Sequence, residues 1–212
     1  MVKRPRVILA DDHKLVAEAL CKLIASDFDV IAVASNGHEL LALAASLKPD
    51  AIVVDIAMPL LNGLEAGRLL KEKMPGVRLV FLTMNEDPDL AREAMDAGAH
   101  GYVLKQSAAS ELVDALRAAL RGKSYVTRQI ARGIQESFAR DPSGRGRLRS
   151  VTPRQRQVVQ LLAEGKSMKE AADVLKVAPR TVAFHKYRLM QDLGLKTNAE
   201  VVQFAIKNRI VV

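Results

Sequence analysis

Residues 51–55 read AIVVD, a short apolar run rich in β-branched side chains that ends in an aspartate. Such a run is typical of a buried β-strand. Four similar runs occur at Val7–Ala10, Val30–Ala34, Leu79–Thr83 and Gly101–Leu104. Amphipathic stretches with helical spacing, such as His13–Ser26 and Ala108–Arg121, alternate with these runs. The alternation predicts an α/β domain over residues 1–121, with a doubly wound, parallel, five-stranded sheet.

Polar side chains follow four of these predicted strands at the point where each strand ends. They are Asp11 and Asp12, Asp55, Thr83 and Lys105. In an open parallel sheet the carboxyl ends of the strands meet at one edge, where ligands bind. We therefore expect three carboxylates, a hydroxyl and an ammonium group to share one pocket.

The chemistry of this predicted pocket favours a hard cation and a phosphoryl group. Clustered carboxylates repel one another unless a cation neutralises them, and all-oxygen ligands suit Mg²⁺. An ionised aspartate can attack phosphorus while Mg²⁺ and Lys105 stabilise the phosphoryl oxygens. Asp55 is the best candidate for the nucleophile, because it stands alone at the end of the central apolar run. The turn Ala10–Lys14, ADDHK, lacks the glycines that a dinucleotide-binding turn requires.

The charge of the chain is divided unevenly. The 212 residues carry a formal net charge of +8. Residues 1–121 contain 14 basic and 17 acidic side chains, a net charge of −3, whereas residues 122–212 contain 18 and 7, a net charge of +11. This asymmetry indicates an acidic module joined to a module that binds nucleic acid or another anionic surface.

The remaining composition is that of a globular protein, with 49% hydrophobic and 26% charged residues. No run approaches the roughly 20 apolar residues of a membrane helix. Residues Met1–Arg6 lead into the first strand without the apolar segment of a signal peptide. We expect a soluble, cytoplasmic protein that does not bind membranes.

After Gly122 the pattern is helical. Ile130, Ile134 and Phe138 form a short apolar stripe, and Asp141–Arg149, DPSGRGRLR, is typical of a flexible basic linker. We expect residues 122–149 to connect the two domains and to contain one short helix. Residues 150–212 follow as a small all-helical domain. The S-x-x-E pattern at Ser167 and the T-x-x-E pattern at Thr197 each predict a capping box at the start of a helix.

Within the second domain, Met168–Leu175, a tight turn and Pro179–Leu193 form a helix-turn-helix pattern. Val182, His185, Leu189 and Leu193 recur at helical spacing and are predicted to face the core. The other face would meet a DNA major groove, through side chains suited to phosphates, guanine or a thymine methyl group. The candidate DNA contacts are Arg180, Thr181, Ala183, Phe184, Lys186, Tyr187 and Arg188.

The segments ILADDH, VVDIAMPLLNGLE, VFLTMNED and GYVLKQSAASEL resemble the receiver domain of bacterial two-component response regulators. The resemblance implies strand order 2-1-3-4-5 and phosphoryl transfer from a sensor histidine kinase to Asp55. It also implies that Asp11, Asp12, Asp55 and the backbone carbonyl of Ala57 hold Mg²⁺. Thr83 and Tyr102 stand where this family has switch residues. Neither Ala57 nor Asn85, which line the pocket, offers a base to align an attacking water.

Residues 151–206 resemble the LuxR-type DNA-binding domain, and together the two halves resemble a response regulator of the NarL/FixJ type. Gln155 and Ala178 depart from the residues common there, and Ala178 removes a helix cap worth about 0.5–2 kcal/mol. The resemblance implies a transcription factor that binds double-stranded DNA and forms a homodimer when phosphorylated. Two alternatives remain: a regulator that needs no phosphorylation, and an aspartate-nucleophile phosphatase, which would want a second acid where Ala57 stands.

Overall fold

A computed structural model of the chain describes residues 4–140, 151–208 and 210–211. The chain divides into two compact units, residues 1–144 and 145–212. The predicted basic linker Asp141–Arg149 lies outside the described residues. Within the described residues, no helix is both long and apolar enough to cross a membrane.

The first unit is built on a parallel sheet with strand order β2-β1-β3-β4-β5-β6. The first five strands confirm the prediction, at β1 (Arg6–Ala10), β2 (Asp29–Ala34), β3 (Ala51–Asp55), β4 (Arg78–Thr83) and β5 (Gly101–Leu104). The predicted strand count of five is wrong, because β6 (Tyr125–Val126) pairs in parallel with β5. A strand of two residues is too short to show a period-2 pattern, and only its pairing with β5 defines it.

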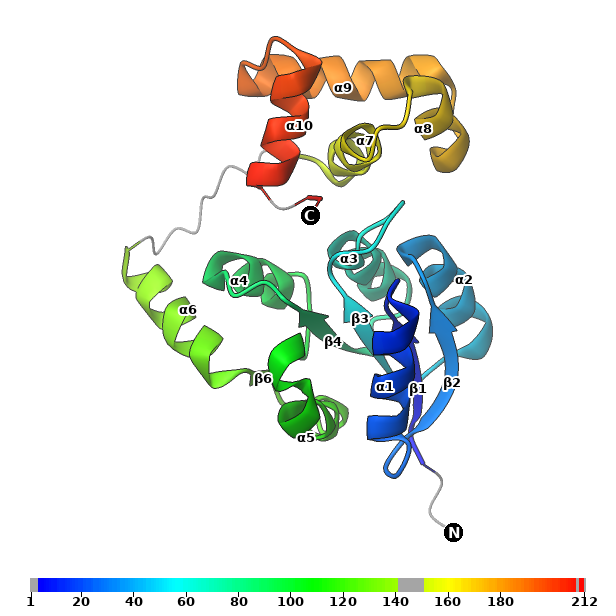
Figure 1. The fold of residues 1–212 in the computed structure, drawn as a ribbon, viewed down its shortest axis with the longest axis vertical. Coiled ribbons are helices and arrows are strands. Elements are labelled where there is room, and N and C mark those ends of the chain that lie inside the picture. The colour runs from blue at the N-terminus through cyan, green and yellow to red at the C-terminus, as the bar shows by residue number, and fades with distance from the viewer. Residues whose placement is uncertain (1–3, 141–150, 209, 212) are drawn as a thin grey trace. The chain divides into compact units, whose positions relative to one another are not determined.

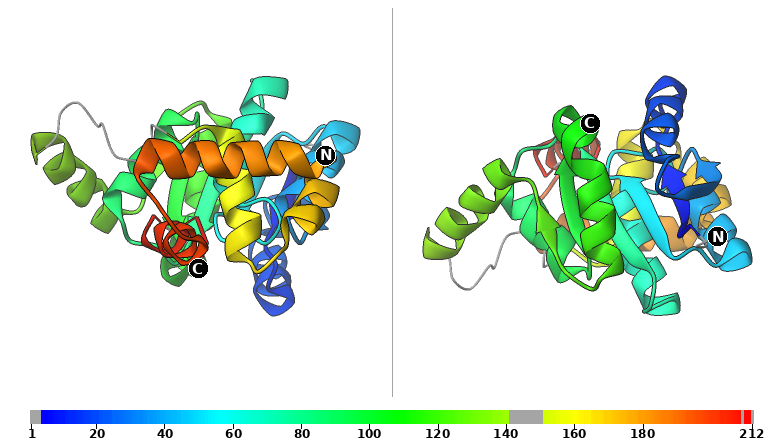
Figure 2. Two further views of the ribbon diagram at one scale, coloured as in Figure 1. Left: turned by 90° about the horizontal axis from the view of Figure 1, so that it is seen from above. Right: turned by 90° about the horizontal axis from the view of Figure 1, so that it is seen from below.

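Helices cover both faces of this sheet (Figures 1 and 2). They are α1 (Lys14–Ile24), α2 (Gly37–Leu47), α3 (Gly63–Lys73), α4 (Pro88–Asp96) and α5 (Ala108–Leu120), with a 3₁₀ turn η1 (Lys105–Ser107) before α5. Alternate strand residues point to opposite faces. Ile8 and Ile52 join one cluster with residues of α2, α3 and α4, whereas Val7 and Val53 join another with residues of α1 and α5.

Helix α6 (Arg128–Arg140) packs against α4 and belongs to the first unit. Ile130 is buried in the cluster of α4, with Ile134 partly buried beside it. Gly133 passes so close to Pro88 that a Cβ atom would lie 2.4 Å from the proline ring. Residues 122–140, which we expected in the connecting segment, thus extend the sheet and one helical layer of the first unit.

Hydrogen bonds fix the start of this extension. The backbone N–H groups of Tyr125 and Thr127 donate to the carbonyls of His100 and Tyr102, at 2.9 and 3.0 Å. The buried hydroxyl of Thr127 donates to the Glu111 carboxylate of α5 at 2.6 Å. A buried hydroxyl with a charged partner forms a strong hydrogen bond, so β6 is attached to both β5 and α5.

The second unit consists of α7 (Pro153–Ala163), α8 (Met168–Leu175), α9 (Pro179–Leu193) and α10 (Asn198–Lys207). Its helix starts follow local sequence signals. Ser167 and Glu170 form the predicted capping box, and Thr152 forms a second one with Gln155. Thr197 accepts from the Glu200 N–H, while the Glu200 carboxylate accepts from the Lys196 N–H instead of closing a box. Val159, Leu189 and Val201 bring α7, α9 and α10 into one core.

A titratable group lies at the amino edge of the sheet in the first unit. The Arg78 guanidinium at the start of β4 lies 2.9 Å from Nε2 of His100, which precedes β5. Burial, followed by the nearby charges of Lys71 and Arg78, lowers the pKa of His100. The neutral ring is therefore the form that this edge accommodates.

We predict that His100 makes the folded state sensitive to mild acid. Its contribution to stability is fully present above the unfolded-state pKa of about 6.5 and is lost as the pH falls through the lower folded-state pKa. The free energy of unfolding, measured by urea titration, should fall more steeply for the wild type than for His100→Gln between pH 7 and about pH 5. Parallel curves for the two proteins would contradict this assignment.

Candidate functional site

Three aspartates meet at the carboxyl edge of the sheet, as the strand ends predicted. Ligand atoms of Asp11, Asp12, His13 and Asp55 all lie within 4.8 Å of one another. Asp11 and Asp55 are each only 3% exposed. Oxygen-rich donor sets of this kind suit a hard divalent cation, and one imidazole nitrogen stands at the rim. We did not anticipate His13, although its position directly after the acid pair was a signal.

Lys105 lies between two of these carboxylates. Its Nζ is 2.7 Å from Oδ2 of Asp55 and 2.8 Å from Oδ2 of Asp11. Burial raises the pKa of Asp55, with the Asp11 charge acting in the same direction and Lys105 opposing both. Burial alone would lower the pKa of Lys105, but its hydrogen bonds to Asp11 and Asp55 outweigh this effect and raise it. The ammonium group is thus held charged beside Asp55.

The loop after β3 holds Asp55 in place through the backbone. The N–H of Ala57 donates to Oδ1 of Asp55 at 3.1 Å, and the N–H of Gly63 donates to the Ile56 carbonyl at 2.9 Å. Gly63 approaches so closely that a Cβ atom would lie 1.9 Å from the Asp55 carbonyl oxygen. Asn62 caps α3 by accepting from the Glu65 N–H. Glycine at position 63 is therefore required by the close approach of the chain to Asp55.

Thr83 and Tyr102 both bind the loop that follows β4. The buried Thr83 hydroxyl accepts from the Asn85 N–H at 3.0 Å. The Tyr102 hydroxyl donates to the Asn85 carbonyl at 2.9 Å, and Tyr102 is fully buried. The Tyr102 ring thus lies inward in this structure. Asn85 connects the two candidate switch residues through its backbone, a connection that the sequence pattern did not reveal.

Glu86, the next residue of this loop, connects three segments. Its carboxylate accepts from the side chain of Gln106 in η1 at 2.7 Å and from that of Gln129 in α6 at 2.8 Å. All three residues are exposed, and exposed polar side chains are usually solvated, so the sequence alone does not reveal this connection. The loop that contacts Thr83 is thereby bonded to the start of α6.

Helix α9 presents two exposed aromatic side chains. Phe184 and Tyr187 are 65% and 57% exposed, and Arg180 and Arg188 are exposed as well. Thr181 and Ala183 are partly buried. Arg188 pairs with Asp192 one turn later at 3.3 Å. Ala178 provides no side-chain cap at the start of the helix, and Pro179 occupies the first turn as expected.

One part of the predicted α9 pattern is wrong. Val182 and Leu189 are buried and Leu193 packs against the core, but His185 is only partly buried, and Lys186 is 6% exposed. With His185, the four core positions are separated by 3, 4 and 4 residues; with Lys186 instead, they are separated by 4, 3 and 4. Both sets of spacings place the four residues on one face of a helix. The spacing alone therefore does not choose between His185 and Lys186, and the long methylene stem of lysine can occupy a core position.

Comparisons with known proteins agree for both units. Residues 7–117 match the response regulator receiver domain, and residues 149–205 match the domain of the luxR family of bacterial regulatory proteins. The chain belongs to the response regulators with a LuxR-type DNA-binding domain. Such proteins are DNA-binding transcription regulators rather than typical enzymes.

Relatives match over almost the whole chain. An uncharacterized transcriptional regulatory protein of Bacillus subtilis, YxjL, is 36% identical with 97% of each chain covered. The transcriptional regulatory protein LiaR of the same species is 31% identical, covering 97% of this chain and 99% of LiaR.

Solved structures give the same result. A LuxR-family two-component response regulator from Aurantimonas sp. is 34% identical, with a TM-score of 0.62, and covers 65% of this chain and 99% of that chain. RcsB from Salmonella enterica serovar Typhimurium, bound to promoter rprA in the presence of phosphomimetic BeF3⁻, is 26% identical with a TM-score of 0.65. The coverage is 95% of this chain and 98% of RcsB.

We predict that removing the Lys105 charge destabilises the first unit of this regulator. Lys105→Met keeps most of the side-chain volume but leaves the buried carboxylates of Asp11 and Asp55 without their cation, which should cost about 3 kcal/mol at pH 7. The cost should shrink in acid, as the Asp55 carboxylate protonates. Urea denaturation measures it, with the exposed Lys123→Met as control. Equal stability of the two variants at pH 7 would contradict the role of this ion pair.

Proposed function

We propose that this response regulator is controlled by transfer of a phosphoryl group from a sensor histidine kinase to Asp55, and that the phosphorylated chain binds promoter DNA through α9. The observation that carries the proposal is the arrangement of Asp55, which is buried at the end of β3 and contacted by the ammonium group of Lys105 at 2.7 Å. A nucleophilic carboxylate beside a fixed positive charge suits phosphoryl transfer.

In the proposed transfer, one Asp55 oxygen forms a bond to phosphorus while the bond between phosphorus and the histidine nitrogen of the kinase breaks. Lys105 stabilises the charge on the phosphoryl oxygens. Asp11, Asp12 and Asp55, with the Ala57 carbonyl, would hold Mg²⁺, which supplies charge neutralisation when bound. Their oxygen donors fit this ion. Ala57 and Asn85 offer no general base for hydrolysis, which favours a long-lived phosphoaspartate and argues against a phosphatase.

A phosphoaspartate adds nearly two negative charges and three acceptor oxygens. The Thr83 hydroxyl, at the end of the neighbouring strand, would turn from the Asn85 N–H to donate to one of these oxygens. Since Asn85 also accepts from Tyr102, this exchange changes the loop that holds both side chains. Glu86 then carries the change to Gln106 and Gln129.

The face formed by α4 and β5 is covered within this chain. In the structure, β6 pairs with β5, and α6 packs on α4, within the same chain. We therefore propose that phosphorylation acts first on the β6–α6 extension and, through it, promotes dimer formation and DNA binding.

We predict that Asp55 is the phosphoryl acceptor. Incubation of the full chain with acetyl phosphate and Mg²⁺ should add one phosphoryl group, detected by intact mass. Asp55→Asn should abolish the mass increase, whereas Asp29→Asn, an exposed aspartate at the amino edge of the sheet, should not. Undiminished labelling of Asp55→Asn would reject the assignment. Repeated turnover of a generic phosphate ester would favour the phosphatase instead.

We also predict DNA binding by the full chain with strong salt dependence, because each phosphate neutralised releases counterions. Arg180→Ala should weaken binding to all sequences and reduce the slope of log K against log salt by about 1. Lys22→Ala, an exposed lysine on α1, should change neither quantity.

Beryllofluoride should raise affinity for fragments selected from a genomic library. Equal affinity with and without it would reject control by phosphorylation, and no binding at low salt would reject the DNA-binding role.

A further inference from the structure

Lys186 occupies a core position of α9. It lies four residues after Val182 and three before Leu189, and these neighbours are 0% and 1% exposed, against 6% for Lys186. The methylene stem of a lysine can replace an apolar side chain at such a position. Its ammonium group needs a partner at such a position, because lysine is almost never fully buried unless its charge is paired.

An aromatic ring lies beside this charge. Nζ of Lys186 lies 5.0 Å from the centroid of the Tyr187 ring. A cation within about 6 Å of a tyrosine face is attracted by the negative potential of the ring, and more strongly when desolvated. The ammonium group of Lys186 therefore restrains the ring of the neighbouring residue.

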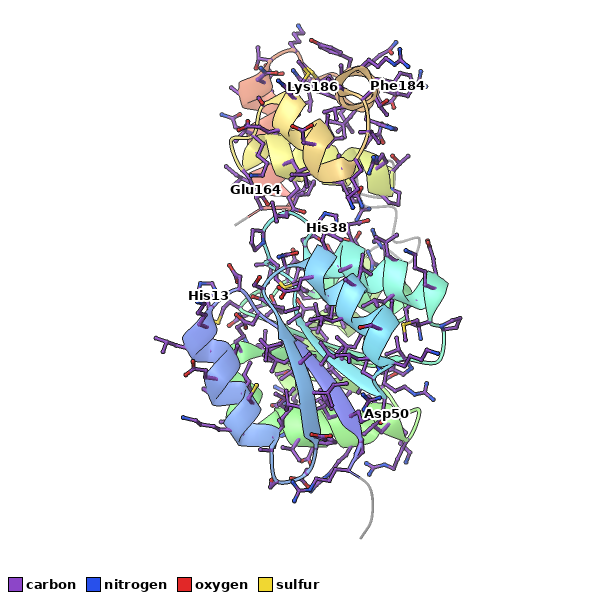
Figure 3. All side chains as sticks on the ribbon, turned by 90° about the vertical axis from the view of Figure 1, so that its right-hand side faces the viewer. His13, His38, Asp50, Glu164, Phe184 and Lys186 are labelled. Atoms are coloured by element: carbon purple, nitrogen blue, oxygen red, sulfur yellow. The ribbon has the colours of Figure 1, made fainter. Side chains whose placement is uncertain are left out.

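Tyr187 itself is on the exposed side of the helix. It is 57% exposed and lies three residues after Phe184, which is 65% exposed, so the two rings are neighbours on the helix surface. Figure 3 looks along α9 and shows Phe184 and Lys186 on opposite sides of the helix, as expected for residues two apart, about 200° around the axis. Lys186 thus lies on the side of α9 away from Phe184, and its Nζ lies beside the ring of the exposed Tyr187.

We propose that Lys186 positions Tyr187 for reading DNA sequence and is not itself a phosphate contact. This inference rests on the proposed DNA binding through α9. It revises our expectation from sequence that Lys186 is a direct DNA contact. Arg180 and Arg188 are exposed and can reach phosphates, whereas Lys186 would have to leave the core to do so.

The benefit of this arrangement is preorganisation. A tyrosine has few rotatable bonds, and a ring that is already restrained in the free protein loses less conformational entropy when it packs against a base. Its ring can contact a thymine methyl group, and its hydroxyl can donate to or accept from a base edge. Such contacts discriminate between sequences, whereas phosphate contacts do not.

The test measures specificity and salt dependence separately. Full-chain variants would be titrated with a duplex selected from a genomic library and with a scrambled duplex of equal length. Lys186→Met keeps the stem and removes the charge. It should lower the ratio of the two affinities about threefold to tenfold, with the salt slope and the scrambled-duplex affinity unchanged. Lys186→Arg should restore the ratio, because a guanidinium group can also lie over the ring.

A double-mutant cycle checks that Lys186 acts through the ring. In a Tyr187→Leu background, Lys186→Met should cause no further loss of specificity. Additive losses would overturn the proposal. A uniform loss on both duplexes with a slope reduced by about 1 would also overturn it, since that pattern marks a phosphate contact.

A measurement without DNA separates this inference from the proposed function. By NMR, the ε-methylene protons of Lys186 should be shifted upfield by the Tyr187 ring in the wild type and in Tyr187→Phe, but not in Tyr187→Leu. Tyr187 is exposed, so these variants should fold. Absence of the shift in the wild type would overturn the proposal even if the chain binds DNA. A wild type that shows the shift but binds no DNA would reject DNA reading by α9.

Discussion

The ammonium group of Lys105 between the carboxylates of Asp11 and Asp55 is the interaction on which the first unit depends. Two buried carboxylates from neighbouring strands repel each other, and a fixed cation within 3 Å of both makes their proximity tolerable. Lys105 can do this because it follows β5 directly and opens η1. The same geometry places Asp55 beside a fixed positive charge, which opposes the rise in its pKa caused by burial.

Much of this pocket could be predicted from the sequence, because topology determines it. Parallel strands bring their carboxyl ends to one edge of the sheet. Once the strands are recognised in the sequence, Asp11, Asp55 and Thr83 are therefore predicted to lie at that edge. The orientation of Tyr102 could not be predicted in this way. Its ring lies inward because the Asn85 carbonyl is there to accept from its hydroxyl, and that carbonyl belongs to a loop 17 residues away in sequence.

The second unit shows a different limit of sequence reasoning. The helices of the helix-turn-helix pattern, and most of their caps, follow from local signals such as Ser167 with Glu170 and Pro179. The choice between His185 and Lys186 for the core face of α9 does not, since both satisfy the helical period. The packing of α9 within the folded unit decides it, since Lys186 is only 6% exposed, and the methylene stem of lysine can occupy such a position. Likewise, the two residues of β6 show no strand pattern in the sequence, and the strand is defined only by its pairing with β5.

The pairing of β6 with β5 also determines how this receiver can be divided. A fragment that ended at the close of α5 would expose the backbone N–H and C=O groups of β5 as an open sheet edge. It would also uncover the apolar surface of α4 that Ile130 and Ile134 cover. Unpaired strand edges next to exposed apolar surface promote self-association. The natural boundary of the folded receiver therefore lies beyond α6, and a fragment intended to stay monomeric should include residues up to at least 140.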